Sequence, residues 1–267
     1  MPNSRVSNSR VSNSRSRPLR IVSYNIHRAI GLDRKFRLDR IVSILEHHSP
    51  DIALLQEVDD GAPRSQGLDL AKQLAEALDY PHYAVGHNVT LRKGRYGNAT
   101  LSRFPIVEER NIDLTIGWRK KRGCQYARVA LPVSGQPEAH LDVFNVHLGL
   151  SATERNKQVR RLVQADEFQR LDEETACVIG GDFNDWRSLM RPFFTQQFNF
   201  RAATDRPHPT GRPDAIRTFP SFSPAGALDR VYFRGETLEL NDAQRCDLKV
   251  SKHASDHLPV IVDFEVK

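Results

Sequence analysis

Nine polar residues of the sequence stand at the ends of short apolar runs, and all of them are Asn, Asp, Glu or His. They are Asn25, Glu57, Asn98, His147, Asp182, Asn184, Asp229, Asp256 and His257. Short apolar runs are typical of buried strands, and a side chain at a strand end lies on a rigid scaffold yet reaches solvent. One such residue carries little information, but a set of these types predicts a site that does chemistry.

Hydrolysis of a phosphate ester is the chemistry that these side chains fit. It needs an activated water, stabilised charge on the phosphoryl oxygens and a leaving group that can depart. Mg²⁺ prefers oxygen ligands and keeps several waters, so one or two carboxylates hold it, and Glu57, which closes the run DIALLQE, is a natural ligand. Asp182 and His257 are suited to orient or deprotonate the water, and Asn184 to donate to a phosphate oxygen.

Each of these residues also has an ordinary structural interpretation. Glu57 could be a surface carboxylate at a strand end, and His147 a hydrogen-bonded core histidine. Asp182 follows two glycines and could form an Asx-turn or a helix N-cap with Asn184. The combination of residues, and not any one of them, favours the chemical interpretation.

Strands and helices that would position these residues follow from the apolar pattern. Leu38, Ile41, Val42 and Leu45 are spaced as on one helix face, and Ser151 with Glu154 has the spacing of a capping box. Helices are expected at 37–48, 67–79 and 151–171, and strands at 20–26, 51–57, 82–86, 98–102, 126–131, 140–146, 176–181, 228–233 and 258–266. Residues 186–227 are expected to form loops and short helices over the site.

Many strands with a few helices, and no regular strand–helix alternation, indicate an α/β (α+β) protein built from mixed sheets packed together. No linker interrupts residues 19–267, so we expect a single domain. Residues 1–18 contain a repeat of Arg, Ser and Asn with almost no apolar content, so we expect a disordered tail. This tail either anchors acidic partners or has no role, and its simple duplication favours the second reading.

Charge and composition narrow the class of protein. The net charge is +6, of which the tail contributes +4 through its four arginines, so the remaining residues carry 6 − 4 = +2. Positive and negative charges are thus nearly balanced in the chain after the tail, which gives little support to a nucleic-acid substrate. No apolar run approaches the roughly 18–20 residues needed to span a bilayer, and the start of the chain does not resemble a secretory signal. The three cysteines have no metal or disulfide spacing, so we expect a cytoplasmic protein. We also expect a monomer.

The sequence resembles the endonuclease/exonuclease/phosphatase superfamily. The resemblance rests on seven segments in the family's order: SYNIH (23–27), LLQEV (54–58), YGNATLSRFPI (96–106), NVHLG (145–149), GGDFN (180–184), LDRVYF (228–233) and SDHLPV (255–260). It implies a deoxyribonuclease-I-like, four-layer sandwich of two packed mixed β-sheets flanked by helices.

The resemblance also implies roles for the residues at the strand ends. The metal, Mg²⁺ with Mn²⁺ as an alternative, would be held by Glu57 with Asn25 and Asp256 close to it. Asp182 would activate or orient the water, and Asp229 would fix the tautomer of His257, which faces the phosphate. The remaining implied residues are His147 as a second catalytic histidine, Asn184 on the scissile phosphate and Asn98 on phosphate. Independently of the family, Arg128 in the strand YARVAL is expected to point at the substrate.

Two departures bear on the branch of the family. Exonuclease-III-like repair enzymes carry Asp where this chain has His27, and they lack a histidine at the position of His147. The sequence is therefore more similar to an uncharacterised bacterial branch with the motif YNIH, to sphingomyelinase-like members and to deoxyribonuclease I. His27 either positions metal or phosphate or only makes hydrogen bonds, and we favour the second.

Three functions remain in competition. The leading one is a metal-dependent phosphodiesterase or nuclease; the next is a phospholipid or phosphoinositide head-group phosphodiesterase or phosphatase. A non-catalytic binding protein is least favoured, because the expected catalytic residues are all present. The stretch WRKKR (118–122) either binds phosphate backbones or is simply solvated, and we favour the second. The phenylalanines at 193, 194, 198 and 200 form either a lid or part of the core, and we favour the core.

Overall fold

The computed structural model describes residues 16–132, 139–206 and 214–267, and two six-stranded sheets dominate it. The first sheet has the order β13-β14-β1-β2-β4-β3 and the second the order β5-β6-β7-β8-β12-β9. Within the first, β1 and β2 are parallel, and within the second, β7 and β8 are parallel; the other neighbours run antiparallel. Both sheets are therefore mixed, as the sequence predicts.

The strands have the following bounds. The first sheet contains β1 (Arg17–Asn25), β2 (Ile52–Asp60), β3 (His82–Thr90), β4 (Arg95–Ser102), β13 (Leu238–Arg245) and β14 (Val260–Val266). The second contains β5 (Ile106–Asp113), β6 (Gly123–Ala130), β7 (His140–His147), β8 (Cys177–Asp182), β9 (Arg201–Ala202) and β12 (Asp229–Arg234). A separate two-stranded ribbon is formed by β10 (Asp205–Arg206) and β11 (Asp214–Ala215).

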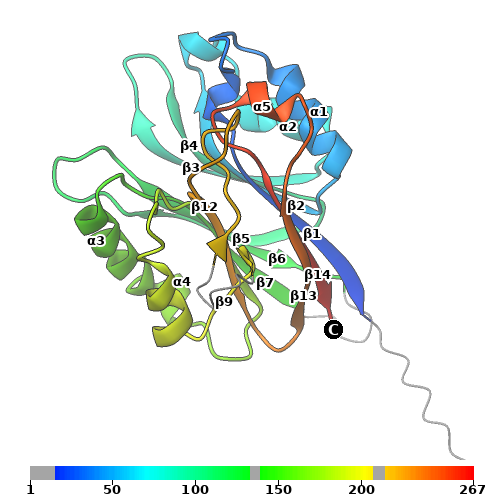
Figure 1. Ribbon diagram of the computed structural model, residues 1–267, viewed down its shortest axis with the longest axis vertical. Helices are drawn as coiled ribbons and strands as arrows, with labels where there is room; N and C mark the ends of the chain where they lie inside the picture. The colour runs from blue at the N-terminus through cyan, green and yellow to red at the C-terminus, as the bar shows by residue number, and fades with distance from the viewer. Residues whose placement is uncertain (1–15, 133–138, 207–213) are drawn as a thin grey trace, which may run out of the picture.

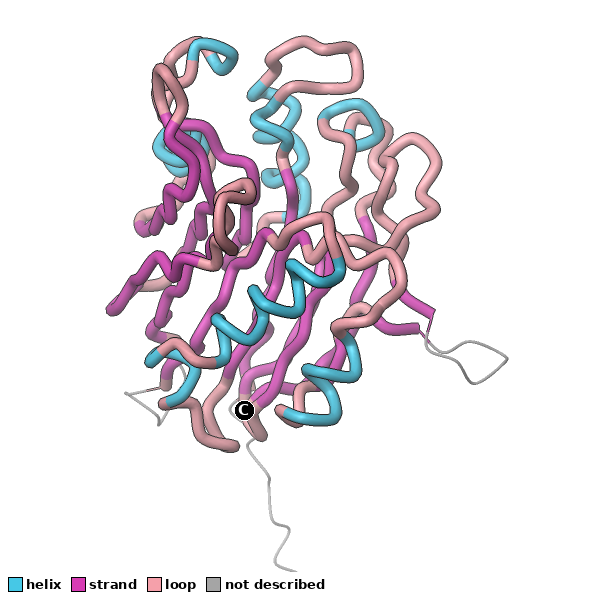
Figure 2. Tube along the Cα trace, turned by 90° about the vertical axis from the view of Figure 1, so that its left-hand side faces the viewer, coloured by secondary structure: helices cyan, strands magenta, loops and turns pink. Residues whose placement is uncertain are grey.

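Three apolar clusters define four layers (Figures 1 and 2). The central cluster joins the inner faces of both sheets, with Ile21 and Leu54 from one and Val143 and Val178 from the other. A second cluster packs α1 (Leu38–His48) and α2 (Leu70–Ala77) on the outer face of the first sheet. A third packs α3 (Ala152–Val163) and α4 (Asp166–Gln169) on the outer face of the second. The expected four-layer sandwich of two mixed sheets flanked by helices is confirmed.

The helices form where the sequence pattern and the caps allow them. In α1 the buried residues are Ile41, Ile44 and Leu45, and the helix ends at His48, followed by the C-cap Ser49 in the left-handed conformation before Pro50. The N-cap of α2 is Asp69, whose carboxylate accepts a hydrogen bond from the backbone N–H of Lys72 at 3.1 Å. Three short helical turns, η1 (His27–Ala29), η2 (Pro63–Ser65) and α5 (Ser251–Ala254), complete the upper end of the molecule in Figure 1.

The expected helix at 151–171 is wrong in its details. It is two helices, α3 and α4, with a break between Val163 and Asp166. Ser151 is the N-cap residue, but its side chain makes no capping hydrogen bond in the described structure, so the capping box is not formed. Glu154 is buried instead and accepts a hydrogen bond from Gln158 at 3.3 Å and lies 3.4 Å from Arg119.

Two edge strands, β5 and β13, were not predicted from the sequence. Among the described residues each pairs with a strand on one side only, and both are largely exposed and carry many charged residues, as is common for edge strands. The strand β1 begins at Arg17, which pairs with Val266, so the folded part includes two residues that the sequence analysis assigned to the tail of residues 1–18. Residues 1–15 of that tail lie outside the described residues.

The segment 186–227 is mostly loop, as expected, and includes the π-helix η3 (Phe193–Gln197). The four phenylalanines between residues 193 and 200 belong to the core: Phe194 and Phe200 are buried, and Phe193 and Phe198 pack against the same cluster. The prediction that these rings are core and not a lid is confirmed.

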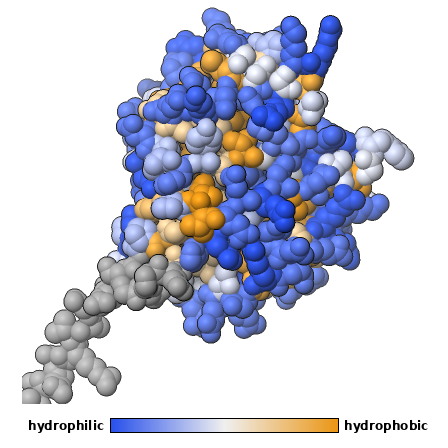
Figure 3. All heavy atoms as spheres, turned by 180° about the vertical axis from the view of Figure 1, so that it is seen from behind, coloured by the Kyte–Doolittle hydropathy of each residue, from blue (hydrophilic) through white to orange (hydrophobic). Residues whose placement is uncertain are grey.

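The surface opposite the view of Figure 1 is mostly hydrophilic, with apolar side chains in separate patches (Figure 3). No helix among the described residues has the length and apolar character to cross a membrane.

Hydrogen bonds between buried amides hold the two sheets in register close to the strand ends. Asn145 of β7 donates from Nδ2 to the carbonyl oxygens of Leu55 (3.1 Å) and Ala99 (3.0 Å) in the first sheet. Its Oδ1 accepts from Nε2 of Gln56 at 2.8 Å. In the other direction, Asn98 of β4 donates to carbonyl oxygens of the second sheet. This network fixes the distance between the strand ends of the two sheets.

Asn145→Leu is expected to lower the free energy of unfolding by about 3 kcal/mol, because it removes three hydrogen bonds between buried groups, those with Leu55, Ala99 and Gln56. Urea unfolding of the full chain measures this. The matched control is Asn241→Leu, an exposed asparagine on β13, which should change stability by less than about 0.5 kcal/mol. Equal losses in both variants would show that the buried network does not stabilise the sandwich.

Candidate active site

Strand register brings three of the expected residues into one row. In the second sheet Asp182, the last residue of β8, pairs with His147, the last residue of β7, on one side. On its other side it pairs with Asp229, the first residue of β12. Since these strands are neighbours, the row forms at one edge of the sheet, as the positions at strand ends predict.

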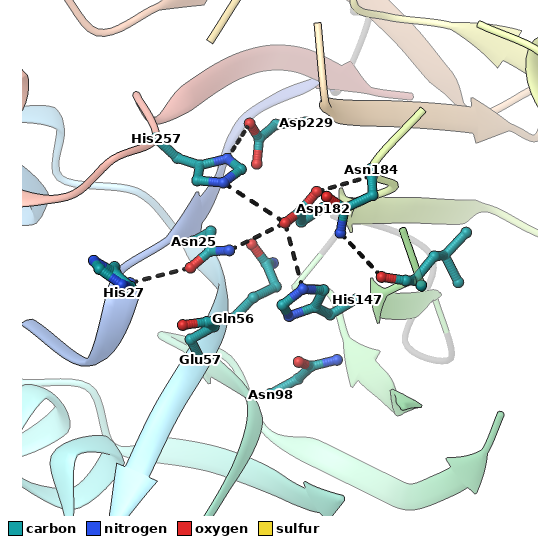
Figure 4. Close-up of polar contacts among 12 residues, drawn as sticks. Asn25, His27, Gln56, Glu57, Asn98, His147, Asp182, Asn184, Asp229 and His257 are labelled. Atoms are coloured by element: carbon teal, nitrogen blue, oxygen red, sulfur yellow. Dashed lines mark hydrogen bonds and ion pairs between the residues drawn. The ribbon is translucent and has the colours of Figure 1, made fainter. Parts of the chain in front are cut away.

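Asn25 and His257, at or next to strand ends of the first sheet, complete the group. Asn25 ends β1, and His257 precedes β14, which is antiparallel to β1. Figure 4 shows the side chains of Asn25, His147 and His257 directed at Asp182 from three sides. The site therefore lies where the ends of the two sheets meet.

Asp182 is the centre of the group and is almost fully buried. Its Oδ2 accepts a hydrogen bond from Nδ2 of Asn25 at 3.1 Å and lies 3.4 Å from Nε2 of His147 and 3.7 Å from Nε2 of His257. Its Oδ1 accepts from the backbone N–H of Asn184 at 2.9 Å. Burial raises the pKa of Asp182 to about 6, against the opposing effect of His257. Its carboxylate is thus ionised at neutral pH yet far more basic than an exposed aspartate.

His257 is held by a second carboxylate. Nδ1 of His257 donates to Oδ2 of Asp229 at 2.8 Å, and the hydroxyl of Thr218 donates to the same oxygen. Burial alone would lower the pKa of His257, but the charges of Asp229 and Asp182 outweigh it and raise the pKa to about 10. The imidazole is therefore a buried cation at neutral pH. The pairing of Asp229 with His257, which the family resemblance implies, is present in the structure.

The pKa of His147 is shifted in the opposite direction to that of His257. Burial lowers its pKa well below the ordinary range, and the nearby charges of Arg122 and Lys120 lower it further. Its imidazole is neutral. The site thus contains one neutral and one charged histidine, both directed at Asp182, so their environments give them different chemical roles.

In the metal-free protein, His257 should remain protonated to about pH 10, whereas His147 should stay neutral at pH 7. Because the pKa of His257 in the folded state is raised, its pairing with Asp229 stabilises the fold fully below about pH 6.5 and loses that effect as the pH rises through about 10. The ¹⁵N shifts of the two rings measure both states. Asp229→Asn should return the His257 titration toward lower pH; an unchanged titration would remove Asp229 as its cause.

Asn184 is close to the centre, in the left-handed conformation with φ 50°. Its Nδ2 donates to the carbonyl oxygen of Leu148 at 3.0 Å, and the turn is closed by Oδ1 of Asp182. The Asx-type turn considered from the sequence is therefore formed, and it places Asn184 beside Asp182. One N–H of its amide remains available for a phosphate oxygen.

Two residues expected to bind phosphate do not fit that role. Asn98 is buried, and both N–H groups of its amide donate to backbone oxygens, those of Gly123 at 3.2 Å and Asn145 at 2.9 Å. It therefore joins the sheets and has no N–H left for a phosphate. The prediction that Arg128 points at the substrate is wrong. Arg128 pairs with Asp142 at 2.9 Å, near the beginning of β7, whereas the site lies at the end of that strand.

Glu57, the expected metal ligand, lies at a β-bulge. Register between β2 and β4 shifts between Leu55 and Val58, and Glu57 has φ 56° there. A bulge re-aims a side chain out of the strand's alternation, and Glu57 directly follows Gln56, the cross-strand partner of Asn25 (Figure 4). Its Oε2 is buried without a hydrogen bond to any described residue and has Arg28 as an ion-pair partner, with Nε at 3.3 Å. A buried carboxylate oxygen without a hydrogen bond fits a cation.

A second grouping also has the geometry of a metal site. Asp182, Asp229 and His257 each offer one ligand atom, and these atoms lie within 4.8 Å of one another. The raised pKa of His257 argues for a proton on its ring, and a protonated ring nitrogen cannot bind a metal. Metal binding at this grouping would require His257 to lose that proton.

Asp256 and His27 lie at the outer side of the site. The carboxylate of Asp256 is partly exposed, and its Oδ1 is 3.8 Å from Nδ1 of His27. That nitrogen is also 3.0 Å from the carbonyl oxygen of Ile30, and the backbone N–H of His27 donates to Oδ1 of Asn25 at 3.0 Å. His27 thus makes hydrogen bonds that position Asn25, in line with the interpretation favoured from the sequence.

Two residues of the site were missed in the sequence. Thr218 lies in the loop-rich segment, where no periodic pattern points to it, and donates to Asp229. Arg28 directly follows the segment SYNIH, and its position inside a left-handed turn at φ 61° brings it onto Glu57. A basic residue next to a recognised motif is a signal that could have been used; for Thr218 there is none.

The chain belongs to the endonuclease/exonuclease/phosphatase family, whose model matches residues 22–257. Members of this family are typically metal-dependent phosphoester hydrolases. The Escherichia coli protein YbhP, itself uncharacterized, is 31% identical over 256 residues, which cover 92% of this chain and 96% of YbhP.

Solved structures agree with the fold. An endonuclease/exonuclease/phosphatase from Beutenbergia cavernae superposes with a TM-score of 0.76 at 21% identity, covering 94% of this chain and 72% of the other. The catalytic domain of human Nocturnin with a bound sulfate anion superposes with a TM-score of 0.73 at 21% identity, covering 94% of each chain.

Proposed function

We propose that this protein is a Mg²⁺-dependent phosphodiesterase in which Asp182 activates a water for attack on phosphorus. One observation carries the proposal: a buried carboxylate with a pKa raised to about 6 lies within 3.7 Å of a histidine that is held as a cation. A base and a positive charge side by side are what attack of water on a phosphodiester requires.

The roles of the residues follow from their contacts. Asn25 and the backbone N–H of Asn184 orient the carboxylate of Asp182, which accepts the proton of the attacking water. The protonated His257, held by Asp229, offers Nε2–H to the charge that develops on the phosphoryl oxygens. His147, neutral beside Asp182, completes the enclosure of the carboxylate.

Glu57 would hold the metal in this proposal, with Asn25 and Asp256 as the further oxygen donors close to it. The donor set is made of oxygens, as Mg²⁺ prefers, and Oε2 of Glu57 is a buried oxygen that accepts no hydrogen bond from the described residues and has Arg28 as its ion-pair partner. When bound, the ion supplies Lewis-acid stabilisation of phosphoryl charge. Mn²⁺ offers the same chemistry.

We also propose that the chain is closer to the bacterial branch with the motif YNIH than to abasic-site repair enzymes. His27 stands where those enzymes carry Asp, and His147 lies against Asp182. The resemblance to YbhP is compatible with that placement. Phosphodiesters of nucleic acids and of lipids share the linkage that this site would cleave.

The test is hydrolysis by the purified full chain of bis(4-nitrophenyl) phosphate, supercoiled plasmid and a phospholipid, each with Mg²⁺ and with chelator. We expect metal-dependent cleavage of the chromogenic diester and of at least one of the natural diesters. A folded protein that binds Mg²⁺ but cleaves none of them would contradict the proposal and favour a non-catalytic binding protein on the same fold.

A further inference from the structure

Large apolar side chains are exposed in a ring of loops around the site. Of the residues that the structure describes, eight large apolar residues are exposed, and six of them lie in these loops. The six, which we call the apolar rim, are Leu32, Trp118, Leu150, Trp186, Leu189 and Phe222, with exposed fractions from 39% for Leu32 to 99% for Trp118. Exposed apolar side chains gathered in one place mark an interaction surface.

The rim loops follow directly from the strands that carry the site. Leu150 comes shortly after His147, and Trp186 shortly after Asp182. The turn before Phe222 is held to the site by the backbone N–H of Ser221, which donates to the carbonyl oxygen of Asp256 at 2.8 Å. The rim therefore surrounds the candidate active site.

Contacts between neighbouring loops make the rim continuous on one side. Arg119, next to Trp118, lies 3.4 Å from Glu154 at the beginning of α3. Arg155 donates to the carbonyl oxygen of Leu150 at 2.7 Å and lies 3.4 Å from Asp185, which precedes Trp186. The loops of Trp118, Leu150 and Trp186 are thus fixed to one another through α3.

The contacts continue around the other side of the site. The ring of Trp186 is 5.6 Å from that of Phe219, which is 5.0 Å from His257. Ser221 donates to the carbonyl oxygen of Lys252 in α5 at 3.1 Å. The backbone N–H of Leu32 donates to the carbonyl oxygen of His253 at 3.1 Å. Figures 1 and 2 show these loops together at the end of the molecule away from the C-terminus.

Basic residues lie close to the apolar ones in the same loops. Arg34 and Lys35 follow Leu32, Arg187 follows Trp186, and the exposed Lys252 lies beside the Phe222 turn. Trp118 is followed by Arg119, Lys120 and Lys121, all exposed. The exposed acid next to Leu32, Asp33, is paired with Arg40 at 2.7 Å. The rim thus offers positive charge around apolar tips.

We propose that the rim docks the protein on an anionic phospholipid bilayer, so that the site acts on a phosphodiester presented at a membrane surface. Trp, Leu and Phe among Lys and Arg is the composition of interfacial binding surfaces, in which the apolar side chains enter the lipid and the basic ones meet the head groups. Leucine side chains offer neither stacking nor hydrogen bonds to bases, so three leucines among six rim residues favour lipid over nucleic acid.

This inference rests on the proposed function for the reaction, but docking itself can be measured without catalysis. The probe is sedimentation of the full chain, in chelator, with vesicles of phosphatidylcholine containing phosphatidylglycerol. We expect binding to these vesicles, weaker binding to phosphatidylcholine alone and weakening with added salt. Trp118→Ser combined with Phe222→Ser should weaken binding on the order of a hundredfold, roughly tenfold for each large side chain that no longer enters the lipid.

The matched control is Tyr83→Ser combined with Val107→Ser. Among the described residues these are the two exposed large apolar ones outside the rim, on β3 and β5, and their replacement should leave vesicle binding unchanged. Every variant retains the arginines of the N-terminal segment, so a loss of binding in the rim variant cannot come from that segment. Thermal melting checks that all variants fold.

Two outcomes would overturn the inference. One is vesicle binding equal in wild type and the rim variant. The other is an absence of vesicle binding together with binding of single-stranded DNA that the rim variant loses, which would make the rim a nucleic-acid surface. Because binding is measured in chelator, intact binding without hydrolysis counts against the proposed function alone, and intact hydrolysis without binding against docking alone.

Discussion

Asp182→Asn is expected to lower kcat for a phosphodiester at least about a hundredfold, the range that a general base typically contributes. The amide has the size of the carboxylate and can still accept the hydrogen bond from the backbone N–H of Asn184. It cannot accept a proton from water, however, and it removes the negative charge beside His257. We expect the variant to fold, because ionisation of a buried carboxylate with a raised pKa does not favour the folded state. Initial rates with bis(4-nitrophenyl) phosphate measure the loss in kcat, and a thermal melt measures whether the variant folds.

The matched control is Asp142→Asn. Asp142 is also buried and lies on β7, the neighbour of β8, but at the opposite end of the sheet, where it pairs with Arg128. Per folded molecule, its rate should equal that of wild type. A loss in Asp182→Asn no larger than the loss in Asp142→Asn would show that Asp182 contributes to stability and not to catalysis.

Glu57→Gln is expected to weaken Mg²⁺ affinity at least about tenfold, which is the lower end of what even loss of an outer hydrogen-bonding partner costs a metal site. The substitution keeps the shape of the side chain and removes the charge of a buried oxygen that has no hydrogen bond among the described residues. Calorimetric titration with Mg²⁺, or Mn²⁺ titration followed by electron paramagnetic resonance, measures the affinity without any substrate.

His257→Gln separates the two groupings that have the geometry of a metal site. If the ion binds at Glu57, this variant should keep its Mg²⁺ affinity within about twofold while losing activity, because His257 acts as a charged donor. If instead Glu57→Gln binds Mg²⁺ as wild type does and His257→Gln does not, the ion belongs to Asp182, Asp229 and His257.

The centre of the site could be predicted from the sequence because strand register determines it. Residues that end neighbouring strands must lie in one row, and His147, Asp182 and Asp229 do. The same reasoning about strand ends should have excluded Arg128, which lies in the middle of a strand and far from the site. Arg128 is five residues along β6 from Gly123, which pairs with His147, a distance of roughly 16 Å that no arginine spans.

What the sequence did not reveal has local physical causes. The role of Asn98 depends on two backbone carbonyl groups in the opposite sheet, which no sequence pattern identifies. The bulge at Glu57 and the left-handed turn at Arg28 are backbone features without a glycine to mark them. The edge strands β5 and β13 lack the apolar alternation of a half-buried strand, since much of their surface faces solvent.

The most direct test of the central claim, that a water activated at Asp182 attacks phosphorus, is hydrolysis of a phosphodiester in ¹⁸O-labelled water with Mg²⁺. Mass spectrometry of the products then shows which bond was cleaved. The account predicts one labelled oxygen in the phosphoryl product and none in the released alcohol. Label in the alcohol would show attack on carbon and would contradict the role of Asp182, Asn184 and His257 around the phosphorus.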